Sequence, residues 1–244
     1  CGIFKDSAPV VMANQLPEVA KIIEAEAKER SADFIIGPNK AEMIDISIKD
    51  SDTSFTYDGC RMKMSLVGRH QILNAQTAIS AVKTLYPATA TENIRSALKN
   101  IRWPGRLQKL QVNPTVFYDV AHNAHGLKAT LMTLKELYPD YKINAVCALK
   151  KSKELAPIAD IIKIYCKKII TTSIDDEEFW TANNLSVGFR KNGINSVPNH
   201  SVSEAFSQCK LKSNNNDIWL IFGTHFLAER VYKIFGFPFD NGII

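Results

Sequence analysis

The chain has 244 residues, of which 45% are hydrophobic and 23% charged, a composition typical of a globular protein with one or two domains. Its formal net charge of +5 is distributed without a long basic run, which argues against a nucleic-acid-binding protein. The five cysteines are odd in number and show no CxxC spacing, so neither a disulfide framework nor a structural zinc site is expected. We expect reduced thiols, no membrane span and a cytoplasmic location.

The first part of the chain alternates short strand-like runs with helical patterns. Pro17 lies in the first turn of a predicted helix, and Tyr57-Asp58-Gly59 is typical of a hairpin turn. Thr91 is predicted to be the N-cap of its helix. The predicted strands lie at 8–13, 33–36, 43–48, 54–57 and 62–67, and the predicted helices at 17–30, 70–86 and 91–100.

Trp103-Pro104-Gly105 interrupts this pattern, because proline and glycine together break regular structure. Trp103 itself is expected to be buried in a core. The runs that follow alternate between strand and helix, which predicts an α/β fold with a mostly parallel, doubly wound sheet. Strands are expected near 114–119, 143–149, 168–172, 194–197 and 217–222, and helices near 125–137, 153–164, 182–192, 201–210 and 224–234. The predicted domains are therefore 1–104 and 105–244.

Polar side chains gather in FYDVAHNAHG, residues 117–126, where a predicted strand passes into a helix. Ligands of open α/β sheets bind at the carboxyl ends of strands, so Asp119 and His122 are candidate site residues. The alternative is that Asp119 and Asn123 only cap the helix. A metal site made of Asp119, His122 and His125 is less favoured, because no ligand spacing supports it.

Four other positions allow both a functional and a structural interpretation. Asn74, on the first turn of a helix, could recognise a base edge or belong to a solvated face. Arg106 could bind phosphate or be an exposed hinge residue. One lysine of Lys150-Lys151-Ser152-Lys153 could bind a carboxylate, although lysine-rich loops are usually only solvated. Thr224, at a helix start, could help to bind an anion or simply cap the helix.

Two common nucleotide-binding loops are missing from the sequence. It contains no GxxxxGK[ST] segment and no GxGxxG segment after a strand. The lysine of Gly37-Pro38-Asn39-Lys40 has the wrong spacing for the first of these loops. The chain is therefore not expected to cradle a nucleoside triphosphate by itself, and a nicotinamide-dependent oxidoreductase is disfavoured.

Five segments, taken in order, resemble the signatures of one enzyme family. WPGRLQ at 103–108 and DVAHNAHG at 119–126 are similar to the W-x-x-R-[LF]-[EQ] and D-G-A-H-N motifs of folylpolyglutamate synthase/dihydrofolate synthase, a branch of the Mur ligases. The other three are GRHQILNAQTA at 68–78, FGTHFL at 222–227 and CGIFKDSAPVV at 1–11. The resemblance extends from residue 1 to about residue 235.

The resemblance implies that this chain is a carboxy-terminal fragment lacking the family's P-loop region. Residues 1–104 would be the tail of the central ATPase domain, and 105–244 the complete Mur ligase carboxy-terminal domain. The main magnesium ligands would lie in the missing part, and none is expected here. The chain alone is expected to be inactive, and its incomplete first domain to fray or to self-associate, for instance as a dimer.

The activity implied by the resemblance is ATP-dependent addition of L-glutamate to a folate or to dihydropteroate, through an acyl phosphate. ATP and Mg²⁺ would be required. The implied roles are adenine recognition by Asn74, phosphate binding by Arg106, ribose binding by Asp119, a position near the γ-phosphate and the amino acid for His122, and glutamate binding by Lys153 and Thr224. His122, Asp119 and Arg106 would form the catalytic group.

Several residues depart from the family's motifs. Val120 replaces a usual glycine and Ala124 a usual proline. Ser152 and Glu154 flank Lys153 where the family has aspartates, which leaves the orientation of this lysine open. Two alternatives remain: another Mur-type amino-acid ligase, and a non-catalytic module that binds a small molecule or a protein.

Overall fold

The computed structural model describes residues 3–36, 43–211 and 216–238. The chain separates into two compact units, Cys1–Arg102 and Trp103–Ile244, each with its own hydrophobic core. The segment 37–40, whose lysine has the wrong spacing for a phosphate-binding loop, lies outside the described residues. No helix in the described ranges is long and apolar enough to cross a membrane.

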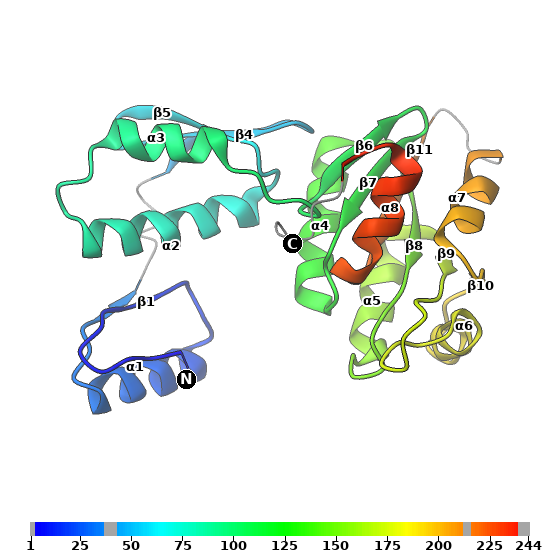
Figure 1. The fold of residues 1–244 in the computed structure, drawn as a ribbon, viewed down its shortest axis with the longest axis horizontal. Coiled ribbons are helices and arrows are strands. Elements are labelled where there is room, and N and C mark those ends of the chain that lie inside the picture. The colour runs from blue at the N-terminus through cyan, green and yellow to red at the C-terminus, as the bar shows by residue number, and fades with distance from the viewer. Residues whose placement is uncertain (1–2, 37–42, 212–215, 239–244) are drawn as a thin grey trace. The chain divides into compact units, whose positions relative to one another are not determined.

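The described residues of the first unit form two small sheets and three helices (Figure 1). A parallel pair of strands is connected by a helix, and three antiparallel strands pack against two more helices. The parallel pair is β1 (Val10–Met12) and β2 (Phe34–Ile36), with α1 (Pro17–Glu29) between them. The other elements are β3 (Ile44–Ile48), β4 (Thr53–Tyr57), β5 (Cys60–Met64), α2 (Arg69–Leu85) and α3 (Thr91–Asn100).

The hairpin between β4 and β5 forms at the predicted turn. Asp58 and Gly59 both adopt positive φ angles, 51° and 67°, as a two-residue hairpin turn of the right twist requires. The prediction for Thr91 was wrong, because Ala90 is the N-cap and Thr91 is the first residue of α3. The Thr91 hydroxyl instead donates a hydrogen bond of 3.0 Å to Asp58 and joins the helix start to the hairpin turn.

The second unit is a six-stranded sheet in the order β10-β9-β8-β11-β7-β6. All pairs are parallel except β6 with β7, which agrees with the predicted α/β fold. The strands are β6 (Gln108–Val112), β7 (Thr115–Asp119), β8 (Lys142–Cys147), β9 (Cys166–Thr171), β10 (Ser196–Pro198) and β11 (Asp217–Phe222). The helices are α4 (Ala124–Leu137), α5 (Leu155–Tyr165), α6 (Ala182–Lys191), α7 (Val202–Leu211), α8 (Ala228–Phe235) and the short 3₁₀ helix η2 (His225–Leu227).

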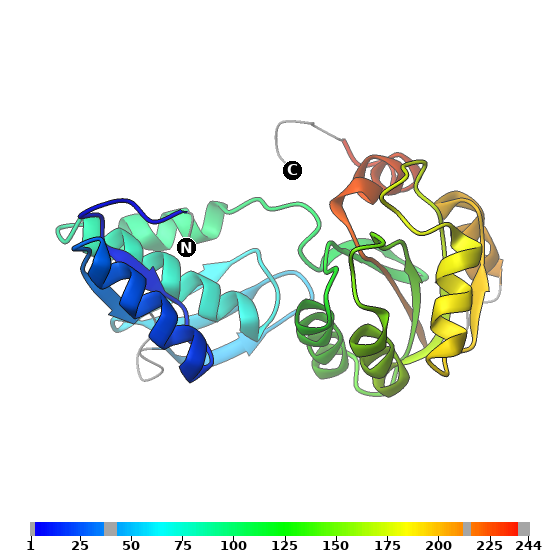
Figure 2. The ribbon, with the colours of Figure 1, turned by 90° about the horizontal axis from the view of Figure 1, so that it is seen from below.

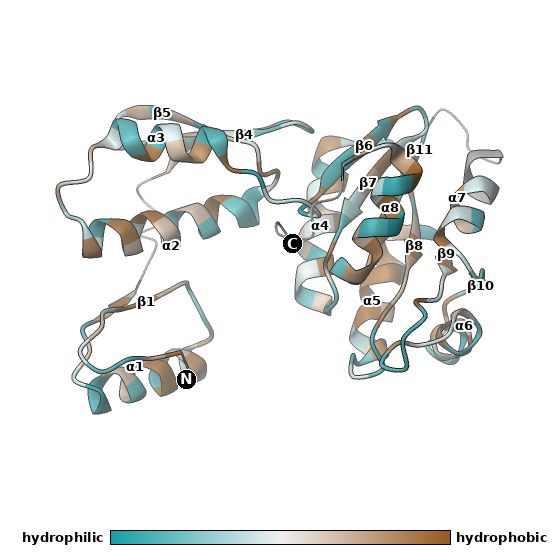
Figure 3. Cartoon of the chain, in the orientation of Figure 1, coloured by the Kyte–Doolittle hydropathy of each residue, from teal (hydrophilic) through white to brown (hydrophobic). Residues whose placement is uncertain are grey.

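Helices cover both faces of this sheet, with α4, α5 and α6 on one face and α7 and α8 on the other (Figures 1 and 2). Every residue of β11 is buried, as expected for a parallel strand between two neighbours and two helical layers. Helix α8 is amphipathic, with hydrophilic and hydrophobic residues alternating along its turns (Figure 3). Its buried residues Val231 and Tyr232 pack into the core on this face.

Two features near the start of the second unit differ from the sequence-based expectation. Trp103 is 60% exposed, so the prediction of a buried core residue was wrong. Strand β6 was not predicted, because its sequence QKLQV is largely polar and occupies an edge of the sheet. An edge strand contacts only one neighbour and needs no continuous apolar run.

Strands β8 and β11 are adjacent and parallel, so their carboxyl ends lie side by side at one edge of the sheet. The chain leaves β8 through α5, on one face of the sheet, and leaves β11 through η2 and α8, on the other (Figures 1 and 2). Strand ends whose connections diverge in this way form the usual ligand-binding crevice of an open α/β sheet. The candidate residues of the second unit lie in the loops that surround this point.

Candidate active site

Asp119 lies at the carboxyl end of β7 and is only 4% exposed. Its Oδ2 accepts a hydrogen bond of 2.8 Å from the backbone N–H of Leu107, and its Oδ1 accepts one of 2.7 Å from Ala121. Burial raises the pKa of this carboxyl to about 6, although the two N–H donors and the charge of Arg106 oppose the shift. Through these two hydrogen bonds, the carboxylate stabilises the backbone of the turn before β6 and of the loop after β7.

Arg106 lies in a tight turn that this carboxylate stabilises. Gly105 and Leu107 have positive φ angles of 72° and 44°, and the backbone oxygen of Gly105 accepts a hydrogen bond of 2.8 Å from Val120. A Cβ at Gly105 would lie 2.7 Å from Val120 Cγ1, so the position requires glycine. The Arg106 side chain is exposed and has no hydrogen-bond or ion-pair partner among the residues described, which leaves its guanidinium available to an anion.

His122 follows in the loop between β7 and α4, with an exposed side chain. Its Nδ1 lies 3.1 Å from the backbone oxygen of Val120. Because a carbonyl oxygen only accepts, Nδ1 carries a proton in this contact, and Nε2 is the acceptor nitrogen whenever the ring is neutral. This is the arrangement that a general base or an acceptor for an amine requires.

Asn123 and His125 have simpler positions. The side-chain oxygen of Asn123 accepts a hydrogen bond of 2.8 Å from Gly126 and caps α4, so the capping alternative is correct for Asn123. Asp119, in contrast, does not cap this helix. His125 is an exposed residue of α4. Within the described ranges, no three His, Cys, Asp or Glu side chains converge as metal ligands, so we assign no magnesium ligand there.

Thr224 is buried at the carboxyl end of β11, in the turn before η2. Its hydroxyl accepts a hydrogen bond of 3.3 Å from the N–H of Phe226, which is the capping role considered for it. Gly223, before it, has a φ angle of 122°, and a Cβ there would lie 2.1 Å from the backbone oxygen of Ala148. The loops after β8 and β11 thus approach so closely that only glycine fits.

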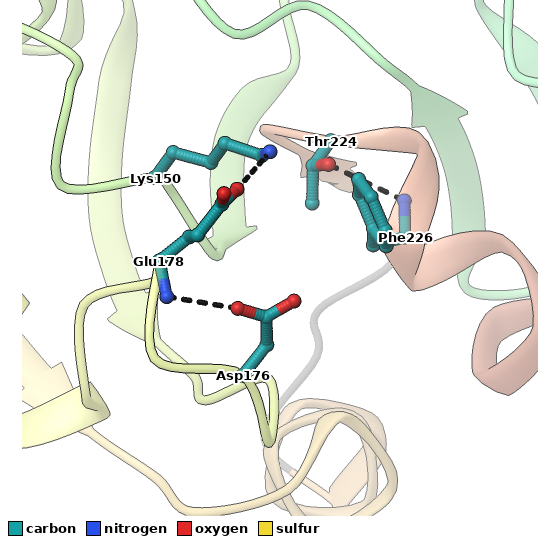
Figure 4. A network of polar contacts seen from close by, with 5 residues as sticks. All are labelled: Lys150, Asp176, Glu178, Thr224 and Phe226. Atoms are coloured by element: carbon teal, nitrogen blue, oxygen red, sulfur yellow. Dashed lines mark hydrogen bonds and ion pairs between the residues drawn. The ribbon is translucent and has the colours of Figure 1, made fainter.

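Lys150, after β8, extends toward the Thr224 turn (Figure 4). Its ammonium nitrogen lies 5.1 Å from the centre of the Phe226 ring and 5.5 Å from that of Phe179, within the range of cation–π attraction. It also forms an ion pair with the carboxylate of Glu178. We call Lys150, Glu178, Phe179 and Phe226 the lysine cluster. Its carboxylate and its two rings hold the ammonium group of Lys150 beside the turn of Thr224.

The long loop between β9 and α6 delivers Glu178 and Phe179 to this cluster. The N–H of Lys151 donates to the oxygen of Glu178 at 2.8 Å, and the N–H of Trp180 donates to that of Leu149 at 3.0 Å. Sequence reasoning missed this loop and did not single out Lys150. The acidic run before Phe179 and Trp180, at the end of a predicted strand, was the available signal.

Lys153, which the resemblance assigns to glutamate binding, is half-buried, and its backbone N–H donates to the oxygen of Lys150 at 3.1 Å. Its side chain has no polar partner within the part of the chain that the structure describes. Lys150 and Lys153 thus lie at the two ends of one hydrogen-bonded turn. Of the two, it is Lys150 whose ammonium group contacts the ring of Phe226, near Thr224.

Asn74 belongs to the first unit, on an exposed side of α2. Its amide nitrogen donates a hydrogen bond of 3.0 Å to Oε1 of Gln71, whose own amide nitrogen lies 3.0 Å from Nε2 of His70. One N–H and the oxygen of Asn74 remain available, which matches the paired donor and acceptor on a base edge. The solvated-face interpretation agrees equally with its exposure.

Comparisons with known proteins identify the family. Residues 105–225 match the family described as "Mur ligase, glutamate ligase domain". The dihydrofolate synthase/folylpolyglutamate synthase of Bacillus subtilis is 26% identical over 245 residues, a match that covers 95% of this chain and 56% of that protein. Residues 105–225 belong to the Mur ligase, glutamate ligase domain family, and the chain as a whole is similar to the dihydrofolate synthase/folylpolyglutamate synthases. It spans about half the length of this curated relative.

Solved structures of this family share the fold. A Mycobacterium tuberculosis folylpolyglutamate synthase complexed with ADP superimposes with a TM-score of 0.82 at 18% identity, covering 94% of this chain and 55% of that one. A bifunctional folylpolyglutamate synthase/dihydrofolate synthase with Mn, AMPPNP and L-glutamate bound gives a TM-score of 0.75 at 18% identity, covering 95% and 54%. At this identity the likeness establishes the fold alone.

The residues of this chain differ in how well they suit a nucleotide. Arg106 offers a free guanidinium, and Asn74 a free donor and acceptor. Asp119 is nearly inaccessible, and each of its oxygens already accepts one backbone N–H, so only its remaining lone pairs are available. Its main effect in this structure is to hold the turn that presents Arg106.

Proposed function

We propose that this chain provides the amino-acid side of an ATP-dependent ligase that adds glutamate to a folate. The proposal depends chiefly on one observation: a free guanidinium, a free imidazole nitrogen and a paired ammonium lie in loops at the carboxyl edge of a sheet that matches the Mur ligase glutamate ligase domain. The names of the relatives and the glutamate bound to one of them support the choice of substrates.

The chemistry requires neutralised charge and a place for one proton. ATP supplies the phosphoryl group that activates the folate carboxylate as an acyl phosphate. The glutamate amine then attacks the acyl carbon, phosphate leaves, and the nitrogen loses a proton. In this proposal Arg106 binds phosphate oxygens, and His122 accepts the proton or holds the amine through Nε2. Asp119 acts as a positioning residue for Arg106.

We infer that Lys150 binds a carboxylate of the incoming glutamate, beside the turn of Thr224. An ammonium group has three donors, and the ion pair with Glu178 leaves the others available. Cation–π attraction to the rings of Phe179 and Phe226 holds the ammonium group beside the turn of Thr224. Lys153, which the resemblance places in this role, is then expected to contribute less.

The test uses the complete gene product, because the chain spans about half the length of its curated relatives. ADP release is measured with tetrahydrofolate, with dihydropteroate, and with L-glutamate present or absent. The proposal predicts ADP release that requires both glutamate and one of the pterin acceptors, and a product heavier by one glutamyl group. Release with a different acceptor and amino acid would indicate another Mur-type ligase. No release with any acceptor would favour a binding module.

A further inference from the structure

A pocket of the second unit lies on the sheet face that α7 and α8 cover. It has a volume of about 660 Å³ and is bordered by the loop after β9, the start of α7 and one side of α8. This size is within the range of sites that hold a small metabolite. None of its lining residues has a role in the proposed ligase reaction.

Charge in this pocket favours an anion. Arg230 and Lys233, three residues apart on α8, project from the same side of the helix. Arg230 donates one long hydrogen bond, 3.4 Å, to the backbone oxygen of Ser173, and its other donors remain available. One carboxylate, Asp175, also lines the pocket, but neither cation forms an ion pair with it in the described part of the chain.

Hydroxyl groups and the start of α7 add uncharged donors. Thr181, Ser201 and Ser203 all line the pocket, and the last two flank the first residue of α7. An arginine fork, an ammonium and several O–H donors suit the three oxygens of a phosphoryl group better than the two of a carboxylate. The positive end of a ten-residue helix acts in the same direction.

A buried hydroxyl precedes the pocket-lining residues Ser173 and Ile174 in the chain. Thr172 is fully buried, and its Oγ1 finds no hydrogen-bond partner among the described residues. Along the extended chain it shares a side with Ile170 and Ile174, which belong to or pack against the core of the α7 and α8 face, and Ile174 lines the pocket. A buried hydroxyl without a partner is costly and uncommon in folded proteins. Thr172 does not line the pocket, so we assign it no contact with the ligand.

The rest of the pocket is apolar, with Ile174, Val202 and Ile234 in its lining. Inorganic phosphate would occupy only a small part of the volume. We propose that this pocket binds a small phosphomonoester, with the phosphoryl group on Arg230 and Lys233 and an apolar body against Ile174 and Ile234. This site does not depend on the proposed ligase activity.

Isothermal titration calorimetry of the chain with phenyl phosphate and with inorganic phosphate tests the proposal. Phenyl phosphate is expected to bind, and more tightly than inorganic phosphate. The double variant Arg230→Gln/Lys233→Gln is expected to weaken binding about tenfold or more. The control Lys128→Gln/Lys167→Gln removes two exposed cations of the same unit and is expected to leave binding unchanged. No binding of phenyl phosphate, equal affinity for both probes, or equal loss in both double variants would overturn the proposal.

A second variant separates binding from folding. Thr172→Val keeps the shape of the side chain and removes an unpaired hydroxyl, so the free chain is expected to unfold at an unchanged or higher urea concentration. Phenyl phosphate is expected to bind this variant as it binds the natural chain, because Thr172 does not line the pocket. In methyl NMR spectra, the signals of Ile174 and Ile234 should shift on binding while that of Ile143 should not.

Discussion

The hydroxyl of Tyr118 donates a hydrogen bond of 2.9 Å to the backbone oxygen of Thr224, which joins the carboxyl ends of β7 and β11. Tyr118 is fully buried, and its ring meets that of Tyr232 edge to face at 5.8 Å. Asp119 follows it directly. One buried side chain therefore fixes the Thr224 turn relative to the strand end that positions Arg106.

Removal of this hydroxyl should destabilise the second unit. Tyr118→Phe leaves a buried carbonyl without its donor, and we expect the free energy of unfolding to fall by about 1–3 kcal/mol. Urea unfolding followed by circular dichroism measures the change. Tyr165→Phe is the matched control, since Tyr165 is half-buried in the same unit and makes no hydrogen bond among the described residues. An equal effect of both variants would contradict the role of the Tyr118 bond.

The buried carboxyl of Asp119 predicts a dependence of stability on pH. Its pKa is raised from 3.8 to about 6, so the folded state holds this proton more tightly than the unfolded state. Protonated Asp119 therefore contributes to the free energy of unfolding. This contribution is complete below about pH 4 and is lost as the pH rises through about 6, a change on the order of 3 kcal/mol. Unfolding free energies measured at intervals between pH 3.5 and 7.5 should show this decline.

Asp119→Asn isolates this effect from other titrating groups. The variant cannot ionise, so the decline in stability between pH 4 and 6 should become smaller by that amount. Its amide offers one acceptor oxygen where the carboxylate offers two to Leu107 and Ala121, so some stability is lost at every pH. Identical pH profiles for the variant and the natural chain would exclude Asp119 as the source.

The alternation of strand and helix after Trp103 was enough to predict the parallel α/β sheet, because buried parallel strands have short, continuously apolar sequences. Strand β6 lacked this signal, since Gln108 and Gln111 lie on an edge strand. The prediction of Thr91 as an N-cap was wrong because its hydroxyl instead contacts Asp58, 33 residues earlier, and no local sequence pattern reveals that contact. Local chemistry thus predicted the elements but not the contacts between distant segments.

The candidate site shows the same division. Asp119 and His122 could be found at a strand end, where the topology concentrates polar residues. The pairing of Lys150 with Glu178, 28 residues later, depends on how the loop after β9 returns beside the loop after β8. The hydrogen bond from Leu107 to Asp119 likewise depends on the turn before β6, and the sequence had not predicted a strand after that turn.

Gly223 should be the least replaceable glycine near the crevice. An alanine Cβ would meet the oxygen of Ala148 at 2.1 Å and would force an unfavourable φ of 122°, so Gly223→Ala should cost on the order of 3 kcal/mol or more. Gly236→Ala is the control: its φ is 72° with nothing within 4 Å, so only about 1 kcal/mol is expected. Urea midpoints compare the two, and equal losses would show that the close approach is unimportant.

Apolar side chains on α1 predict self-association of the chain. Leu16, the N-cap residue of α1, and the helix residues Val19 and Ile22 are spaced three apart and are all exposed, which forms an apolar stripe on one side of the helix. We expect the mass measured by light scattering to rise with concentration, and Val19→Lys/Ile22→Lys to reduce that rise. Val187→Lys, at an exposed position of α6, serves as the control. A constant monomer mass for the natural chain would contradict this prediction.

The last prediction separates the two lysines that compete for the glutamate carboxylate. In the complete gene product, Lys150→Met should raise the KM for glutamate about tenfold or more with a smaller change in kcat, because a binding contact is lost. Lys153→Met should change the KM less than about threefold. Lys151→Met, at an exposed neighbouring position, controls for the general loss of charge. If Lys153→Met has the larger effect on KM, the loop after β8 must present Lys153 to the substrate, and the lysine cluster would then have only a structural role.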